Sequence, residues 1–349
     1  MKSIRASFRD YGNWQRRQLG GRFVAADLEH KHDLMRADPF AFLRGTCWRW
    51  AEIAHSVCPD LADAPNIQSV GDAHVENFGL WRDREGRLVW GVNDYDEAAP
   101  SPWPFDLVRL AASALLAAPR RHEAAALAEA ILHGYRRGLE APRPFVLQQK
   151  RLWLRDLFAA GRKERGAFWD AILCAPADSD PDGELAKALA DSLPEEGIAV
   201  AFARRRAGVG SLGHLRLVAA AADWRGGPLA REAKAVLPSC WDREGEAGAG
   251  YALASGRYRA PDPWLQVTHG AVIRRLAPDS RKLELRDEKD HVRRRLLKAM
   301  GRDIAAVHAA DEARVEAARA DLDRRPADWL TRAAQAAVEA TERDWKGWR

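Results

Sequence analysis

The chain has 349 residues, of which 47% are hydrophobic and 30% are charged. This balance is typical of a soluble globular protein long enough for two domains or two lobes, and it excludes fibrous, disulfide-scaffold and wholly disordered classes. The 55 Lys and Arg residues exceed the 50 Asp and Glu residues. The mild positive excess suggests an anionic partner but does not identify it.

The cysteines and the apolar runs indicate the cellular compartment of the protein. No C-x-x-C pair is present among Cys47, Cys58, Cys174 and Cys240, so neither a zinc knuckle nor a disulfide framework is indicated. The N-terminal residues lack the apolar core of a signal peptide, and the longest apolar run, 110–119, is too short to span a bilayer. We therefore expect a cytoplasmic protein with four small buried thiols and no membrane partner.

The first half of the chain is predicted to be mainly helical. Residues 39–53 are apolar and aromatic at helical spacing, and residues 67–92 predict a loop followed by a β-hairpin with Gly86 at its turn. Chemistry is often placed on such loops. Helical periodicity then continues in three segments, 106–138, 152–173 and 183–193.

From Gly197 the apolar period shortens to two. Three successive strands of an antiparallel meander are predicted, followed by two further strands and then two helices. The predicted strands are 197–206, 214–223, 229–237, 264–267 and 271–276, and the predicted helices are 288–320 and 326–349. A second, β-rich lobe therefore begins near this glycine.

The most informative segment is Gly71-Asp-Ala-His-Val-Glu-Asn77, which spaces Asp72 and Asn77 as D-x-x-x-x-N on a predicted loop. Kinase catalytic loops use this spacing. There, the carboxylate accepts the proton of an attacking hydroxyl and the amide oxygen binds a magnesium ion that carries the nucleotide phosphates. Taken alone, the two residues are better explained as turn formers, so the interpretation needs support from other segments.

An acidic cluster, Asn93-Asp-Tyr-Asp-Glu97, follows the apolar strand of the hairpin. Kinases place a second magnesium ligand at the end of that strand. Asp94 occupies the position, and Asp96 adds a further carboxylate. Because closely spaced carboxylates repel one another, they favour a cation between them, so Asn77, Asp94 and Asp96 are candidate metal ligands.

A glycine-rich loop, Gly208-Val-Gly-Ser-Leu-Gly213, lies between two predicted strands. A dinucleotide-binding fingerprint would need a helix after the glycines, so the context favours a hairpin that covers phosphates. Lys234 on the next strand is positioned to pair with the α and β phosphates, with Glu244 or Glu246 as its acidic partner. The candidate nucleotide-binding residues are Gly208, Gly210, Ser211, Gly213 and Lys234.

Several of these segments together resemble a known family. PFAFLRG, GDAHVENFG, VNDYDEA, PWPFDLVRLAAS and AGVGSLG are similar, over most of the chain, to a bacterial family catalogued as domain of unknown function 2252. GDAHVENFG and NDYDEA also resemble the aminoglycoside-phosphotransferase type of kinase-like enzyme. The resemblance implies that Asp72 is the catalytic base, that Asn77 and Asp94 bind the metal, and that Asp106 braces the catalytic loop. Val70 stands where that type has a histidine, and His74 lies inside the loop instead.

The motif order is permuted relative to ordinary kinases, in which the glycine-rich lobe comes first. Residues 300–309 resemble the helix that normally leads into the catalytic loop, yet they lie near the C-terminus. We therefore expect an α+β, two-lobed, protein-kinase-like fold that is circularly permuted. Residues 1–194 and 288–349 would form a helical catalytic lobe, and residues 195–287 a small antiparallel β lobe that binds nucleotide.

The resulting functional hypothesis is a phosphotransferase that uses ATP and Mg²⁺, or Mn²⁺, on an unidentified hydroxyl acceptor. Arg44 and His74 join Asp72 as candidate catalytic residues, and Arg44, like Arg109, is otherwise a packing arginine paired with an acid. A variant of the hypothesis transfers AMP instead of phosphate. The alternatives are a metal-dependent phosphoesterase, suggested by the D-x-H pair at residues 72–74, and an inactive pseudokinase or binding module. The basic runs 204–206 and 291–298 are expected to be solvated faces, so nucleic acid is not an expected partner.

Overall fold

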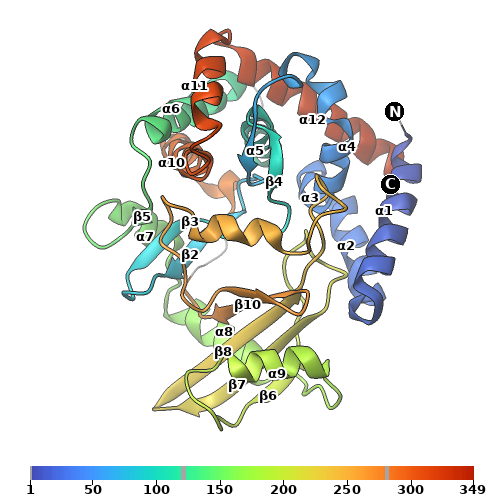
Figure 1. Ribbon diagram of the computed structural model, residues 1–349, viewed down its shortest axis with the longest axis vertical. Coiled ribbons are helices and arrows are strands. Elements are labelled where there is room, and N and C mark those ends of the chain that lie inside the picture. Colours follow the sequence, from blue (N-terminus) through green and yellow to red (C-terminus); the bar gives the residue numbers. More distant parts are fainter. Residues whose placement is uncertain (1, 119–122, 280–282) are drawn as a thin grey trace.

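The computed structural model describes residues 2–118, 123–279 and 283–349 and has an α+β fold (Figure 1). Helices form about half of it, and the described strands form small antiparallel sheets. The N- and C-terminal ends lie side by side, where Arg5 Nε donates to the Gly347 carbonyl at 3.0 Å. Within the described part of the chain, none of the helices combines the length and apolar character needed to cross a membrane.

Four helices begin the chain: α1 (Ile4–Leu19), α2 (Ala25–Ala37), α3 (Pro39–Gly45) and α4 (Cys47–Val57). The single helix predicted over 39–53 is therefore two helices, α3 and α4. Asp38 caps the first by accepting a hydrogen bond from the Ala41 N–H, and Pro39 occupies its first turn. Thr46 interrupts the pair, because it leaves helical geometry and its hydroxyl donates to the Phe42 carbonyl.

Two small sheets present the predicted catalytic segments. β1 (Asn66–Ser69) pairs with β4 (Ala99–Pro102), and β2 (Phe78–Arg82) pairs with β3 (Leu88–Val92), which also pairs with β5 (Phe145–Val146). The predicted hairpin is confirmed, with Gly86 at its turn and φ of 73°. Residues 70–77 connect β1 to β2 and residues 93–98 connect β3 to β4. The two acidic segments therefore leave neighbouring strand ends.

The described residues form eight further α-helices: α5 (Pro104–Ala117), α6 (Ala124–Glu140), α7 (Leu152–Phe158), α8 (Arg162–Leu173), α9 (Gly183–Asp191), α10 (Asp290–His308), α11 (Val315–Arg324) and α12 (Trp329–Trp348). α5 and α6 account for the predicted segment 106–138, of which residues 119–122 lie outside the described residues. The helix predicted over 288–320 is wrong in its length. It ends at His308, and in the following turn Asp311 accepts a hydrogen bond from the Gln68 N–H on β1.

Two glycines allow α6 and α10 to pack unusually closely. A Cβ on Gly134 would lie 2.0 Å from the Lys298 carbonyl oxygen, and one on Gly301 would lie 2.3 Å from the Ile131 carbonyl oxygen. Such contacts are impossible for any larger residue, so both positions require glycine. The close packing brings the C-terminal end of α10 to the loop that carries Asp72.

The glycine-rich loop belongs to a five-stranded antiparallel sheet with the order β6-β7-β8-β10-β9. Its strands are β6 (Ala201–Arg204), β7 (Arg216–Trp224), β8 (Gly227–Ala235), β9 (Gln266–Thr268) and β10 (Ala271–Leu276). The predicted meander and the two later strands are confirmed. Between β8 and β9, the short helix η4 (Ala249–Ser255) carries Tyr251.

The sheet has its own packing partners. On one face, Leu217, Ala233 and Ile273 bury against Leu185 and Leu189 of α9. Part of the opposite face, including Val218 and Ala230, is covered by Ile172 of α8. The predicted lobe boundary at residue 195 assigned α8 and α9 to the helical lobe, whereas both helices pack on the sheet.

Candidate functional site

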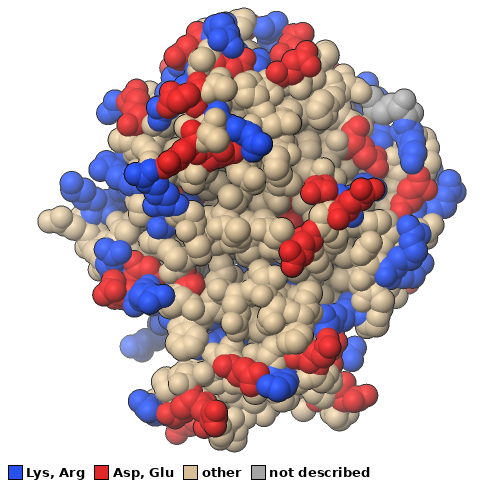
Figure 2. Space-filling view, in the orientation of Figure 1, with Lys and Arg blue, Asp and Glu red and all other residues tan. Residues whose placement is uncertain are grey.

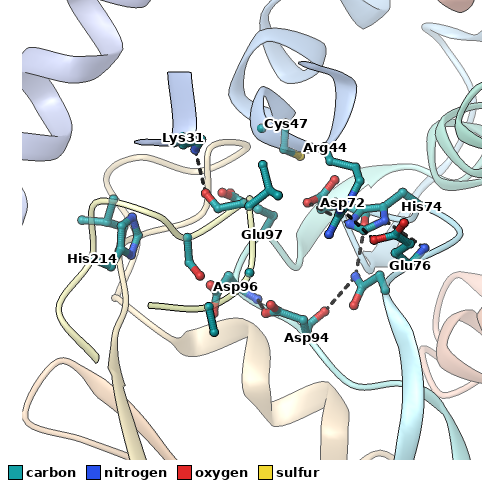
Figure 3. A pocket seen from close by; sticks show the side chains of 18 of the residues that line it. Lys31, Arg44, Cys47, Asp72, His74, Glu76, Asp94, Asp96, Glu97 and His214 are labelled. Atoms are coloured by element: carbon teal, nitrogen blue, oxygen red, sulfur yellow. Dashed lines mark hydrogen bonds and ion pairs between the residues drawn. The ribbon is translucent and has the colours of Figure 1, made fainter. Parts of the chain in front are cut away.

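A cavity of about 280 Å³ lies where the loops 70–77, 93–98 and 207–213 meet (Figure 3). The first two loops leave the strands of the two small sheets and the third belongs to the five-stranded sheet, so the cavity lies between these sheets. The sequence-predicted residues that line it are Arg44, Asp72, His74, Asn77, Asp94, Asp96, Gly208, Gly210 and Ser211. Lys234 lies beside it through ion pairs to two of these residues, whereas Gly213 is not among its lining residues.

Asp106 holds the backbone that precedes Asp72. Its carboxylate accepts hydrogen bonds from the N–H groups of Val70 at 2.7 Å and Gly71 at 2.9 Å. Gly71 has φ of +77°, and a Cβ there would lie 1.8 Å from the Glu97 carbonyl oxygen. The bend before Asp72 therefore needs both a buried acceptor and a residue without a side chain.

Asp72 lines the cavity, and a buried arginine contacts one of its carboxylate oxygens. Arg109, whose side chain is 3% exposed, lies 2.6 Å from Asp72 Oδ1 and also donates to the Leu43 carbonyl. Arg109 is absent from the cavity lining. It therefore acts as a buried partner that fixes the Asp72 rotamer, which is one of the two interpretations that the sequence left open.

His74 and Arg44 are both organised by Glu76. His74 Nδ1 accepts the Glu76 N–H at 3.2 Å, which leaves the proton of the neutral ring on Nε2, 3.8 Å from Asp72 Oδ2. Burial lowers the pKa of His74 to about 3, so the ring is neutral near pH 7. Arg44 forms an ion pair with Glu76 at 2.8 Å. Both predicted catalytic residues reach the cavity, at the end that holds Asp72 (Figure 3).

Asn77 links the two acidic loops. Its Nδ2 donates to the carbonyl oxygens of Asp72 at 3.0 Å and Asp94 at 3.1 Å. Its Oδ1 is buried and has no partner among the described residues. A buried amide oxygen without a partner can serve as a ligand for a hard cation, so Asn77 remains a candidate magnesium ligand together with Asp94.

Lys234 pairs with the acidic cluster, not with Glu244 or Glu246. Its Nζ lies 3.1 Å from Asp94 Oδ1 and 2.7 Å from Asp96 Oδ1. The predicted partners are wrong, because both glutamates are exposed on a turn before η4. Tyr251 of η4 approaches instead, and its hydroxyl donates to Asp96 Oδ1 at 2.8 Å.

The surroundings shift the acidity of the cluster in opposite directions. Burial opposes ionisation of Asp94, but the charges of Lys234 and Arg274 outweigh it and hold the pKa of that carboxyl well below its usual range. Burial raises the pKa of Glu97 to about 7, despite a hydrogen bond from the Cys240 N–H. Among the described residues, no group of three or more His, Cys, Asp and Glu side chains is arranged to hold a metal ion, so the candidate set depends on the Asn77 amide.

The glycine-rich loop is anchored at two points. The Gly210 carbonyl accepts a hydrogen bond from Lys31 Nζ of α2 at 2.7 Å, and the Ser211 hydroxyl accepts one from Arg216 at 2.5 Å. Gly213 was predicted to bind nucleotide, but it lies away from the cavity. Its carbonyl accepts a hydrogen bond from the Val24 N–H of the N-terminal segment.

Lys31 is a cavity residue that the sequence analysis missed. Its side chain is buried, and burial lowers its pKa to about 8 although Glu97 and Asp72 lie near enough to oppose the shift. No local motif surrounds it in the sequence. Only the folded structure identifies it, because α2 packs against the glycine-rich loop and brings Lys31 to the cavity.

Three charged residues on the sheet, Arg216, Glu232 and Arg274, were also missed. Glu232 is fully buried and forms ion pairs with Arg205 at 2.6 Å, Arg216 at 2.7 Å and Arg274 at 2.7 Å. These arginines hold the pKa of Glu232 well below its usual range against the opposing effect of burial. Arg205 was expected on a solvated face, but it lines the cavity. Charges at alternate positions of predicted strands were the available indication.

The other basic residues agree better with the sequence analysis. Arg204 pairs with Asp178 and Arg206 pairs with Asp27, each at 2.8 Å or less. On the face drawn in Figure 2, the described basic and acidic side chains are interspersed around a largely uncharged centre. The prediction is wrong for Arg293 in the second basic run, because its side chain is 3% exposed and pairs with Glu123.

All four cysteines are free, as the sequence analysis expected. Three are buried, but the expectation that all would be buried is wrong for Cys174, which is exposed at the C-terminal end of α8.

Comparison with known proteins gives a match to part of the chain. A family model described as an uncharacterized protein conserved in bacteria (DUF2252) matches residues 22–157. The match contains the segments around Arg44, Asp72, Asp94 and Asp106, and it covers less of the chain than the resemblance predicted, because it ends before the five-stranded sheet. Searches of curated proteins and of solved structures gave no match.

Proposed function

We propose that the protein is an ATP- and magnesium-dependent group-transfer enzyme with a circularly permuted, kinase-like arrangement, acting on a hydroxyl acceptor. The observation that carries the proposal is convergence on one cavity. Asp72, Asp94 and Gly210 come from three separate segments, yet all line it, and Lys234 reaches it through Asp94. Had the glycine-rich loop faced away from Asp94, the proposal would have failed.

The arrangement of the sheet supports the kinase-like part. In protein kinases a glycine-rich loop covers the phosphates and the phosphate-binding lysine lies on the third strand. Here the glycine-rich loop connects β6 to β7, and Lys234 lies on β8, the third strand of the meander.

The position of α10 supports the permutation. His308, its last residue, lies 3.1 Å from Asp106, which braces the loop before Asp72. α10 therefore ends where the helix leading into a catalytic loop would end, although the chain reaches that loop far earlier in the sequence.

The proposed roles follow from the contacts. Asp72, oriented by Arg109, accepts the proton of the acceptor hydroxyl as its oxygen attacks phosphorus, and the bond from phosphorus to the leaving phosphate breaks. Asn77 and Asp94 would hold the magnesium ion, which neutralises phosphate charge when bound. Lys234 and the N–H groups of the glycine-rich loop bind the phosphate chain.

The test uses purified protein with labelled ATP and Mg²⁺ or Mn²⁺. We expect ATP binding and slow transfer of label, to the protein itself or to water. Asp72→Asn should lower turnover by about 10²- to 10⁴-fold with little change in ATP affinity, whereas the exposed Asp33→Asn should behave as wild type. Absence of both nucleotide binding and turnover would reject the proposal.

A further inference from the structure

The side of the sheet that faces the cavity is charged where a purine would need an apolar surface. In the strand register, Lys234 lies opposite Arg216, and Glu232 lies opposite Arg274. Residues directly opposite each other in antiparallel strands share a face, as do residues two apart on one strand. These four charged side chains therefore form one patch. Arg205 is a fifth member, because it forms an ion pair with Glu232.

This patch keeps unneutralised positive charge. Arg205, Arg216, Arg274 and Lys234 carry four positive charges, against three negative charges on Glu232, Asp94 and Asp96, so one positive charge is left over. The Arg216 side chain is only 5% exposed, and its Nε is buried without a partner among the described residues. Three guanidinium groups that share one buried carboxylate keep donors for a further acceptor and are suited to a phosphate chain.

The contacts also fix an order along the cavity. Arg216 lies opposite Lys234 in the strand register. Asp94 contacts Lys234 and, through its carbonyl, Asn77, and Asn77 in turn contacts the Asp72 carbonyl. The sequence of groups is therefore the arginines, the Lys234 and Asp94 pair, Asn77, and finally Asp72.

A nucleotide can lie along this order in two directions. If its γ-phosphate faced Asp72, its nucleoside would cover the arginines. That would remove guanidinium groups from water without giving them an acceptor of comparable charge, which is costly. If its terminal phosphates lay on the arginines, the charges would be matched, and the α-phosphate would be the one nearest Asp72.

On the basis of the proposed function, we propose that Arg205, Arg216 and Arg274 bind the β- and γ-phosphates and that the enzyme transfers a nucleotidyl group. The acceptor oxygen forms a bond to the α-phosphorus as its proton passes to Asp72. The bond between that phosphorus and the oxygen bridging to the β-phosphorus breaks, and pyrophosphate leaves with the bonding electron pair. AMP becomes attached to the acceptor.

The first experiment measures binding of ATP, AMP and inorganic tripolyphosphate, each with Mg²⁺, by calorimetry. Arg274→Gln should weaken ATP and tripolyphosphate by about 10- to 100-fold, the effect of losing a charged hydrogen-bonded pair, and should change AMP affinity by less than about twofold. Arg275→Gln is the matched control, because Arg275 is the next residue on β10, points to the other face and pairs with Asp262. Thermal unfolding checks that both variants are folded.

The second experiment identifies the products formed when water replaces the acceptor. AMP and pyrophosphate support the proposed orientation. ADP and phosphate would overturn it while leaving the proposed function intact, as would an equal loss of AMP and ATP affinity in Arg274→Gln or tripolyphosphate binding unaffected by that substitution. A wild-type protein that binds neither ATP nor tripolyphosphate would reject the proposed function itself, and this inference with it.

Discussion

His308 Nε2 lies 3.1 Å from Asp106 Oδ2, although 202 positions separate the two residues in the chain. Nδ1 of the same ring lies 2.8 Å from the Tyr135 hydroxyl on α6. Asp106 also accepts the N–H groups of Val70 and Gly71. The bend before Asp72 is thus held by a buried hydrogen-bond network that three distant helices supply, and each member satisfies a polar group that would otherwise be costly to bury.

We expect Asp106→Asn to destabilise the protein and to misplace Asp72. An amide has one acceptor oxygen, so either the Val70 or the Gly71 N–H would face a donor instead of an acceptor. Leaving a buried donor unsatisfied costs about 1–3 kcal/mol, which urea unfolding would measure as a lower unfolding free energy. Asp323→Asn, at an exposed ion pair with Arg136, should change it by less than about 0.5 kcal/mol. Equal unfolding free energies for the two variants would contradict the bracing role.

Local patterns predicted most of the secondary structure because the periods are clear. The period of two from Gly197 onward identified every strand of the five-stranded sheet, and Gly86 identified the hairpin turn. The break after His308 was not predictable, since residues 309–314 favour a helix by composition and the contact that fixes the turn, Asp311 with Gln68, is made across the fold.

In the candidate site, too, the residues within local motifs were predicted, and the contacts between distant segments were not. Asp72, Asn77, Asp94 and the glycine-rich loop were found because each is part of a motif with fixed spacing. Asp94 was missed as the partner of Lys234 because the two residues lie 140 positions apart in the chain. Asp94 belongs to the loop after β3, whereas Lys234 lies on β8. Charged strand residues such as Glu232 usually lie on the surface, so nothing local shows that this one is buried among arginines.

Lys234→Met should destabilise the protein strongly and make its stability depend on magnesium. The Lys234 side chain is 1% exposed and is the counter-cation of Asp94 and Asp96. Removing one partner from a buried ion pair costs about 3–5 kcal/mol, because the remaining charges lose their compensation. A divalent cation can replace part of the lost charge, so adding Mg²⁺ should raise the unfolding free energy of this variant more than that of wild type.

The matched control for that experiment is Lys187→Met. Lys187 is 76% exposed and pairs with Asp191 on the surface of α9, so its loss should cost less than about 1 kcal/mol. A cost as small as this for Lys234→Met would show that the acidic cluster does not need its lysine.

The burial of Lys31 predicts an increase of stability with pH. Its pKa falls from 10.5 to about 8 in the folded protein. Between these values the unfolded chain retains a proton that the folded chain has released, so the unfolding free energy rises with pH. The penalty for burying the charged amine is complete below about pH 8 and is gone above about pH 10.5, a gain of about 3 kcal/mol.

Other groups titrate in the same range, so the measurement compares wild type with Lys31→Met. Urea unfolding of both proteins at several pH values gives the difference between their unfolding free energies. We expect that difference to shift in favour of wild type as pH rises from about 8 to 10.5. A constant difference would mean that Lys31 remains charged in the folded protein over this pH range.

Gly71→Ala and Gly86→Ala form a pair that separates backbone strain from steric exclusion. Both glycines have positive φ, 77° and 73°, so alanine should strain either site by about 1 kcal/mol. At Gly86, on the hairpin turn, nothing lies within 4 Å of the added Cβ. At Gly71 the Cβ would lie 1.8 Å from the Glu97 carbonyl oxygen, and a backbone atom cannot move aside as the end of a side chain can.

We therefore expect Gly86→Ala to retain full ATP turnover and Gly71→Ala to lose stability by several times the strain of the control. Because any relief of the Gly71 clash must shift Asp72, the variant should also lose turnover under conditions where it remains folded. Similar stability and turnover in the two variants would show that the contact between Gly71 and Glu97 does not determine where Asp72 lies.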